Sequence, residues 1–177
     1  MIKTLLFILR LHFAPLYANT QAMCTDFIKN VMNGMHAFGA TEIRAGTTKD
    51  TLKGALYFAS ATIDSQTAVY TVTGEVGASG SYVAGGIAFT TATAPNTSGT
   101  AASGVGNKAF FTPSASWTTG AGFSAAAFDT ILMYNDTFST KRSVAVFTFG
   151  SQTIIAGTFT LTMPTNDGTT GLVRFGT

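Results

Sequence analysis

The last fifty residues of the chain place the strongest limits on its fold. From Phe128 the sequence runs FDTILMYNDTFSTKRSVAVFTFGSQTIIAGTFTLTMPTNDGTTGLVRF, a series of short β-branched and aromatic runs separated by turn residues. Within it, Phe159, Leu161 and Met163 alternate strictly with threonines. This period of two predicts a strand with one buried face and one face presented outward. The segment therefore predicts antiparallel β structure that supplies surface and shape.

The same pattern extends through most of the chain. Strands are expected at 52–59, 67–73, 87–91, 108–117, 123–134, 142–149, 153–163 and 171–175. The glycine-rich passage 77–86 suits a bulge or the close approach of another chain, and residues 92–107 suit an exposed loop. About eight short strands without helices between them argue for an antiparallel β-sandwich, of jelly-roll or Ig-like type, or a barrel-like variant. Because crossover helices are lacking, a parallel α/β fold is not expected.

One amphipathic helix is predicted near the N-terminus, at about 20–35. Met23, Phe27, Val31 and Met35 recur every four residues and would form one apolar stripe. Asn19 or Thr20 could cap its start, and Asn33-Gly34 would end it. We expect this helix to lie against the sheet or against a neighbouring subunit.

The domain organisation predicted is an N-terminal extension, 1–18, followed by a single β-sandwich domain, 19–177. The extension has a basic start at Lys3 and a short apolar run that Arg10 and His12 interrupt, and Pro15 should break any helix that continues past it. Three interpretations remain open: a poor signal peptide, an amphipathic interaction arm, or an upstream segment without a structural role. The apolar run is too short to span a bilayer.

Composition narrows the class of partners. Only 10% of the 177 residues are charged, against about 25% in ordinary soluble domains. The net charge is +2, and Lys141-Arg142 is the one cluster of basic residues beyond the extension, so nucleic acid is not an expected partner. A Thr, Ser, Gly and Ala surface suits a chain covered by neighbours. The single cysteine, Cys24, allows no intrachain disulfide and is expected to be a small buried group.

Catalytic, cofactor and metal sites are not predicted. The only histidines are His12 and His36, and His36 is expected to hydrogen-bond a backbone carbonyl where the chain turns after the helix. The acids are scattered, and Asn135-Asp136 and Asn166-Asp167-Gly168 are better explained as turns than as calcium loops. Trp117 is expected to anchor the core, with a carbohydrate platform as the alternative. Predicted core residues are Phe27, Val31, Leu56, Phe58, Trp117, Leu132, Phe147, Phe159 and Leu161.

Several stretches, in order, resemble a family of small structural proteins from tailed-bacteriophage virions, over about Ala18 to Phe175. The matching stretches are CTDFIK at 24–29, GMHAFG at 34–39, LKGALY at 52–57, YVAGG at 82–86, Trp117 before a glycine-containing turn, ILMYND at 131–136, FTFGS at 147–151, IAGTFTL at 155–161 and GLVRF at 171–175. The resemblance implies a non-enzymatic virion component. The apolar N-terminal arm and the long loop 92–107 depart from this pattern.

The favoured function is therefore a capsid decoration, or cement, subunit that stabilises the phage head. Its expected partners are other copies of itself, a trimer for example, and virion proteins such as the major capsid protein or a tail protein. No nucleic acid, membrane or cofactor is expected, and the expected location is the virion, assembled in the host cytoplasm.

Other functions stay open. The alternatives are a tail tube, collar or fibre-associated subunit, a receptor or glycan-binding module, and, if residues 1–18 act as a signal peptide, a secreted bacterial surface protein. An enzyme is the least favoured class.

Overall fold

A computed structural model describes residues 20–39, 49–90, 95–98 and 108–175 of the chain. Strands dominate, and every strand pairing in the described residues is antiparallel. The mainly β, antiparallel class expected from the sequence is therefore confirmed. The predicted extension 1–18 lies outside the described residues, as do 92–94 and 99–107 of the predicted loop.

The N-terminal helix is much shorter than predicted. Thr20–Met23 forms strand β1, which pairs with β8, and the helix α2 covers only Phe27–Met32. The predicted helix start near residue 20 was thus wrong, and the helix ends at Met32, three residues before the predicted bound of 35. Asp26 stands at the N-cap without a side-chain capping bond, whereas Asn33 closes the helix and Gly34 follows with a φ of 68°. The predicted stop at Asn33-Gly34 is confirmed.

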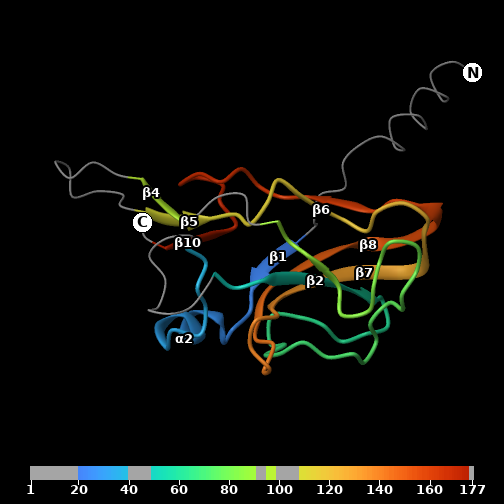
Figure 1. The fold of residues 1–177 in the computed structure, drawn as a ribbon, viewed down its shortest axis with the longest axis horizontal. Coiled ribbons are helices and arrows are strands. Elements are labelled where there is room, and N and C mark those ends of the chain that lie inside the picture. Colours follow the sequence, from blue (N-terminus) through green and yellow to red (C-terminus); the bar gives the residue numbers. More distant parts are fainter. Residues whose placement is uncertain (1–19, 40–48, 91–94, 99–107, 176–177) are drawn as a thin grey trace, which may run out of the picture.

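A five-stranded sheet forms the centre of the fold, in the order β1-β8-β7-β2-β3. Its members besides β1 are β2 (Leu52–Phe58), β3 (Ile87–Ala88), β7 (Phe123–Asn135) and β8 (Ser143–Gly157). Strands β7 and β8 make one long hairpin that turns between Asn135 and Ser143. Figure 1 shows β7 and β8 side by side, running from the middle of the molecule to the right of the view.

Two smaller sheets cover one face of the central sheet. Strand β6 (Ser116–Thr118) pairs with β9 (Thr160–Thr162), and β5 (Lys108–Phe111) pairs with β4 (Asn96–Ser98) and β10 (Val173–Phe175). Figure 1 shows β6 above β7 and β8, and it shows β4, β5 and β10 grouped at the left of the view, above α2. The layers meet at Phe159, whose ring centroid lies 5.1 Å from that of Phe128 and 5.0 Å from that of Phe149.

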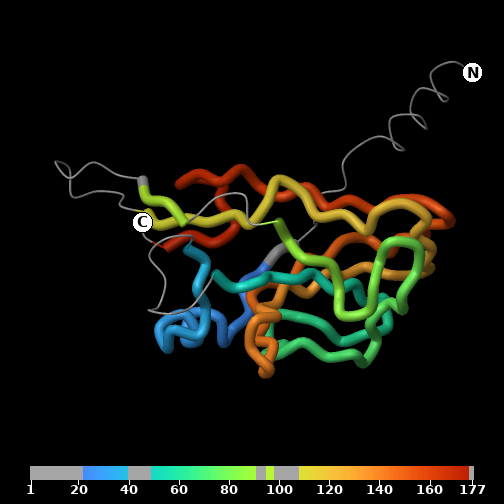
Figure 2. Tube along the Cα trace, in the orientation of Figure 1, coloured from blue at the N-terminus to red at the C-terminus, as the bar shows by residue number. Residues whose placement is uncertain are grey.

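An irregular segment, 59–86, covers the opposite face. Figure 2 shows it, in teal to green, running beneath the central sheet. Tyr70 of this segment stacks on Tyr134 of β7 with ring centroids 4.7 Å apart. Because both faces are covered, successive residues of β7 from Thr130 to Asn135 are all buried. The predicted strand 123–134 is therefore confirmed, and in this part it is buried on both faces.

Most predicted strands are present, with corrections. Residues 67–73 are not a strand, and only a bridge from Val69 to Arg142 remains there. The predicted strand 108–117 is two short strands, β5 and β6. Two strands were predicted at 142–149 and 153–163. The structure has instead one continuous strand, β8, up to Gly157, and then the short strand β9. Within the predicted loop 92–107, Asn96–Ser98 forms β4.

The core lies between the central sheet and the layer that contains β6 and β9. Seven of the nine predicted core residues are buried, namely Phe27, Leu56, Trp117, Leu132, Phe147, Phe159 and Leu161. Val31 and Phe58 are partly buried and pack against this core. The alternation at the C-terminal end of the fold is confirmed, since Phe159, Leu161 and Met163 are buried while Thr158 and Thr160 are exposed.

Candidate functional site

A carboxylate, Glu75, lies at the centre of a polar cluster on the face covered by 59–86. It accepts hydrogen bonds from Tyr70 Oη at 2.5 Å, from Tyr82 Oη at 3.0 Å and from the backbone N–H of Gly85 at 2.7 Å. Tyr82 Oη in turn accepts a bond from the backbone N–H of Leu56 at 2.9 Å. The cluster therefore connects two parts of the irregular segment, Tyr70–Glu75 and Tyr82–Gly85, with each other and with Leu56 of β2.

Two more tyrosines extend this cluster. Tyr57 Oη donates to the carbonyl of Thr71 at 2.6 Å, and Tyr134 Oη donates to the carbonyl of Gly85. Burial raises the pKa of Tyr57, Tyr70, Tyr82 and Tyr134 above the ordinary value of 10.0, so their hydroxyls stay protonated and serve as donors. These groups hold segments together, and each of the bonds described ends on another group of the same chain.

A second charged group lies beside the β7–β8 turn. Asp136 contacts Lys53 Nζ at 2.7 Å and Lys141 Nζ at 3.2 Å. Burial opposes ionisation of Asp136, but the hydrogen bonds and charges of the two lysines outweigh it and hold the pKa of the carboxyl below 3.8. Lys141 also lies over the ring of Tyr70, 5.0 Å from its centroid. This turn is therefore fastened to β2 and to the irregular segment.

His36 belongs to a buried polar group at the end of β7. Its Nδ1 lies 3.2 Å from Asn135 Nδ2, and Asn135 Nδ2 also donates to Asp50 Oδ2 at 2.6 Å. The same carboxylate oxygen accepts the backbone N–H of Ala37 at 2.6 Å. The described partners of these side chains are thus one another and nearby backbone groups, an arrangement that positions the chain after α2.

Trp117 and Cys24, which the sequence predicts to be buried, are both in the core. Trp117 is 2% exposed, and its Nε1 donates to the carbonyl of Ile87 at 2.9 Å, so the core interpretation is confirmed and a carbohydrate platform at Trp117 is excluded. Cys24 is also 2% exposed, and burial raises the pKa of its thiol to about 12, as expected for a buried apolar group.

Asp167 accepts the backbone N–H groups of Thr169 and Thr170, each at 2.7 Å, and so forms the predicted turn.

The glycines of the 77–86 passage allow close backbone approach. A Cβ on Gly80 would lie 2.4 Å from the backbone carbon of Gly122, and one on Gly86 would lie 2.1 Å from the carbonyl oxygen of Gly54. Both glycines have positive φ, 57° and 77°. These two close approaches are made to other parts of the same chain. The approach of another chain to this passage stays a prediction.

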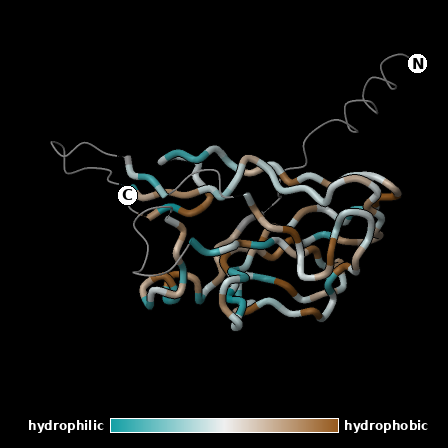
Figure 3. The backbone as a smooth tube through the Cα atoms, viewed as in Figure 1, coloured by the Kyte–Doolittle hydropathy of each residue, from teal (hydrophilic) through white to brown (hydrophobic). Residues whose placement is uncertain are grey.

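The most unusual surface is the end of the molecule away from the β7–β8 turn, here called the neutral end. It is built from 76–90, 113–128 and 149–163, none of which contains an Asp, Glu, Lys, Arg or His. These segments are joined by β6–β9 and β7–β8 pairing, and Ser124 N donates to Ser79 Oγ at 2.9 Å. Figure 3 shows much of the β6–β9 ribbon as pale, meaning near-neutral hydropathy.

The exposed side chains of the neutral end are small and uncharged. They include Ser81, Val83, Ala84, Ser116, Thr118, Ser124, Ala126, Ser151, Thr153, Ile155, Thr158 and Thr160. Ile155 is 84% exposed and Val83 is 55% exposed. Depletion of charge is the compositional mark of interface cores, because covering a neutral surface requires no ion to be desolvated. This end can therefore be covered by another protein at low cost.

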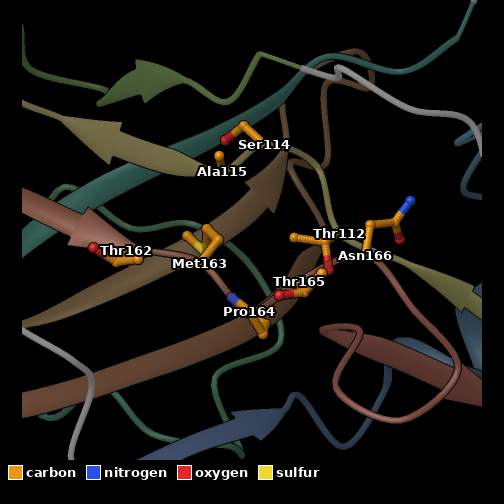
Figure 4. A pocket seen from close by; sticks show the side chains of 8 residues that line it. All are labelled: Thr112, Ser114, Ala115, Thr162, Met163, Pro164, Thr165 and Asn166. Atoms are coloured by element: carbon orange, nitrogen blue, oxygen red, sulfur yellow. The ribbon is translucent and has the colours of Figure 1, made fainter.

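A cleft of about 390 Å³ adjoins the neutral end (Figure 4). It opens where the chain passes from β5 to β6 and, opposite, beyond β9; its lining is Thr112, Ser114, Ala115, Thr162, Met163, Pro164, Thr165 and Asn166. Two of its hydroxyls already have partners, since Ser114 Oγ donates to the carbonyl of Ser116 and Thr112 Oγ1 accepts the N–H of Leu172. The lining has no acid, base or cation, so it offers neutral contact only.

In the described ranges, no three His, Cys, Asp or Glu side chains gather as a metal site requires. Among the helices that the structure describes, none is long and apolar enough to cross a membrane. No family model, curated protein or solved structure matches the chain.

Sequence reasoning missed the Glu75 cluster and the neutral end. The cluster joins residues scattered between Tyr57 and Tyr134, without a repeated spacing that could have revealed it. The neutral end did leave a signal, because the charge-free runs 76–107, 109–128 and 143–166 can be read directly from the sequence. Their assembly at one end follows from strand pairing.

Proposed function

We propose that this protein is a non-enzymatic structural subunit of a tailed-bacteriophage virion and that it acts as a capsid decoration subunit. The observation that carries the proposal is the neutral end, whose exposed side chains suit contact with protein more than chemistry on a small molecule. The resemblance of residues 18–175 to phage structural proteins supplies the virion setting. Partners of this subunit would be other copies of itself and the major capsid protein.

The proposed mechanism is mass action. A subunit that binds the assembled shell, and binds separated capsid proteins less well, stabilises the shell in proportion to its binding free energy. A stable contact of this kind buries more than about 1,000 Å². A neutral, hydroxyl-rich surface can supply such an area without unpaired charges, since its Thr and Ser side chains can pair with backbone groups of the capsid.

The fold supports the same proposal. The central sheet and the layer of β4, β5, β6, β9 and β10 face each other across an apolar core. We assign this arrangement to the β-sandwich class, related to jelly-roll or Ig-like folds. Such a scaffold leaves strand edges and loops available for contacts between subunits.

The test is to add the full chain to capsids from which the subunit has been depleted. We expect the temperature at which the capsids disrupt to rise, and an unchanged temperature would contradict the decoration role. A variant with charges on the neutral end, Thr118→Lys with Thr160→Lys, should bind capsids less well. The matched control places lysines at two exposed sites on the helix, Ile28→Lys with Met32→Lys, and should bind normally.

A tail role is the second outcome of the same experiment. If the chain forms closed rings and binds tails but not capsids, it is a tail tube, collar or fibre-associated subunit. Electron microscopy of the purified protein with each particle separates the two outcomes, because a ring has cyclic symmetry and a head-bound subunit follows the capsid lattice.

A further inference from the structure

Half of β8 has a strand on one side only. Strand β1 pairs with β8 only from Ala145 to Thr148, whereas β7 pairs with the other side of β8 as far as Gly157. From Phe149 to Gly157, no strand in the described part of the chain pairs with the other side of β8. Along such an edge, alternate residues present their N–H and C=O groups outward, which is a template for another strand.

This open edge carries neither a charge nor a proline. Proteins ordinarily guard an exposed edge with lysine, other charges or proline. Residues 149–157 contain none of these, and their exposed side chains include Ser151, Thr153 and Ile155. The register with β7 is irregular here: β8 carries extra residues between Thr148 and Gln152 and between Ile154 and Gly157, and Ala156 has a φ of 49°. The regular part of this edge is therefore Gln152–Ile154, which is centred on Thr153.

The absence of charge favours a second copy of this chain as the occupant. Two identical edges pair in antiparallel fashion about a two-fold axis, so that the residue nearest the axis faces its own copy. A charged side chain at that position would therefore face a like charge, which is unfavourable. The whole of 143–166 is free of ionisable groups, so self-pairing meets no such repulsion.

We propose that the open edge of β8 pairs antiparallel with the same edge of a second copy, with Thr153 at the two-fold axis. Thr153 is the midpoint of the exposed run Ser151–Ile155 and is itself exposed. The pairing would join two five-stranded sheets into one continuous sheet and would bring the neutral ends of both copies together. This inference rests on the proposed role as an assembling subunit and names the surface used between copies.

Cysteine cross-linking of the full chain tests the register. In a Cys24→Ala background, Thr153→Cys would place two cysteines opposite each other with Cα atoms about 4.5–5.5 Å apart, within the range that a disulfide spans. We expect a covalent dimer after mild oxidation. Thr118→Cys, which is also at an exposed position but lies on β6, should stay monomeric on a non-reducing gel. Equal cross-linking at both positions would overturn the proposal.

Sedimentation of charge variants tests the pairing itself. Thr153→Lys puts like charges at the axis and should weaken the dimer by about tenfold or more. Thr153→Ala removes the bond that Ala127 N makes to Thr153 Oγ1 but adds no charge, so the dimer should persist. A dimer unaffected by Thr153→Lys would overturn the proposal, as would a wild-type chain that stays monomeric at all concentrations tested.

The outcomes separate this inference from the proposed function. If the wild-type chain stabilises depleted capsids without forming a dimer through β8, the edge pairing is wrong and the decoration role stands. If the β8 dimer forms but capsids are unaffected, the edge pairing stands and the decoration role is wrong. If deleting residues 1–19 creates the dimer, the edge is filled by the chain's own N-terminal segment, and pairing between full-length copies is overturned.

Discussion

Gly54 lies directly against the indole of Trp117, so that a Cβ on Gly54 would be 2.8 Å from Trp117 Nε1. The indole N–H is held by the carbonyl of Ile87, the residue that pairs with Gly54 across β2 and β3. The strand pairing and the tryptophan position thus depend on the same glycine. Because Trp117 anchors β6, this contact connects the central sheet to the layer above it.

We therefore predict that Gly54→Ala destabilises the protein by about 1–3 kcal/mol, since the added methyl group overpacks a site between Trp117 and Phe89. The free energy of unfolding in urea measures this effect. Gly77→Ala is the matched control, because a Cβ there would meet no atom within 4 Å. Its stability should stay within about 1 kcal/mol of wild type. Equal effects of the two changes would show that Gly54 is not tightly packed.

The Glu75 cluster gives a second prediction. Glu75→Gln replaces a carboxylate that accepts three bonds with an amide that has one acceptor oxygen, so at least one donor loses its partner. We expect a loss of about 1–3 kcal/mol and faster amide hydrogen exchange over 67–86. Asp64→Asn makes the same chemical change at an exposed turn and should leave exchange in 67–86 unaltered. Unchanged exchange in Glu75→Gln would refute the role of this carboxylate.

The two preceding sites also mark where sequence reasoning succeeded and failed. The alternation of apolar and polar residues predicted β2, β7 and β9. In each of these strands, every second side chain points to a buried face. It failed at 67–73, a segment of high β propensity, because Tyr70 there bonds to Glu75 and stacks on Tyr134 in place of forming a ladder. β propensity describes each residue alone, whereas the contact with Tyr134 joins residues that lie far apart in sequence.

The helix 20–35 failed for a related reason. Met23 fits the four-residue spacing of Phe27 and Val31, yet it lies on β1 opposite Ala145. The pairing of β1 with β8 is a contact between residues more than a hundred positions apart, and no local pattern reports it. The neutral end likewise could be read as charge-free runs, but their gathering in space depends on the same long-range pairing.

Acid should weaken the β7–β8 turn through Asp136. Since the pKa of Asp136 is lowered from 3.8 in the folded protein, its ion pairs stabilise the fold fully above that value and are lost as the pH falls through the lower, folded value. Asp136→Asn should therefore be less stable than wild type at pH 7, and the difference should shrink as the pH falls below about 4. Urea midpoints at several pH values measure it.

The control for this pH dependence is Asp26→Asn. The Asp26–Lys29 pair is exposed, with side-chain exposures of 35% and 62%, so its loss should change stability little at any pH. A difference between Asp136→Asn and wild type that stays constant from neutral to acid pH would contradict the role of the lysine contacts.

The Cys24 thiol should be unreactive in the folded protein. Burial raises its pKa to about 12, the charge of Asp64 adds to this and the nearby Ser143 opposes it, so at pH 8 almost no thiolate is present. We expect a thiol reagent at pH 8 to modify the native chain only as fast as the fold opens, and the urea-unfolded chain rapidly. In a Cys24→Ala background, Thr118→Cys on the exposed face of β6 should react rapidly without urea.

If Cys24 of the native chain reacted at the rate of the unfolded chain, β1 and α2 would not cover it. If the rate of Cys24 modification rose at urea concentrations below the main unfolding transition, β1 and α2 would be the first part of the fold to open.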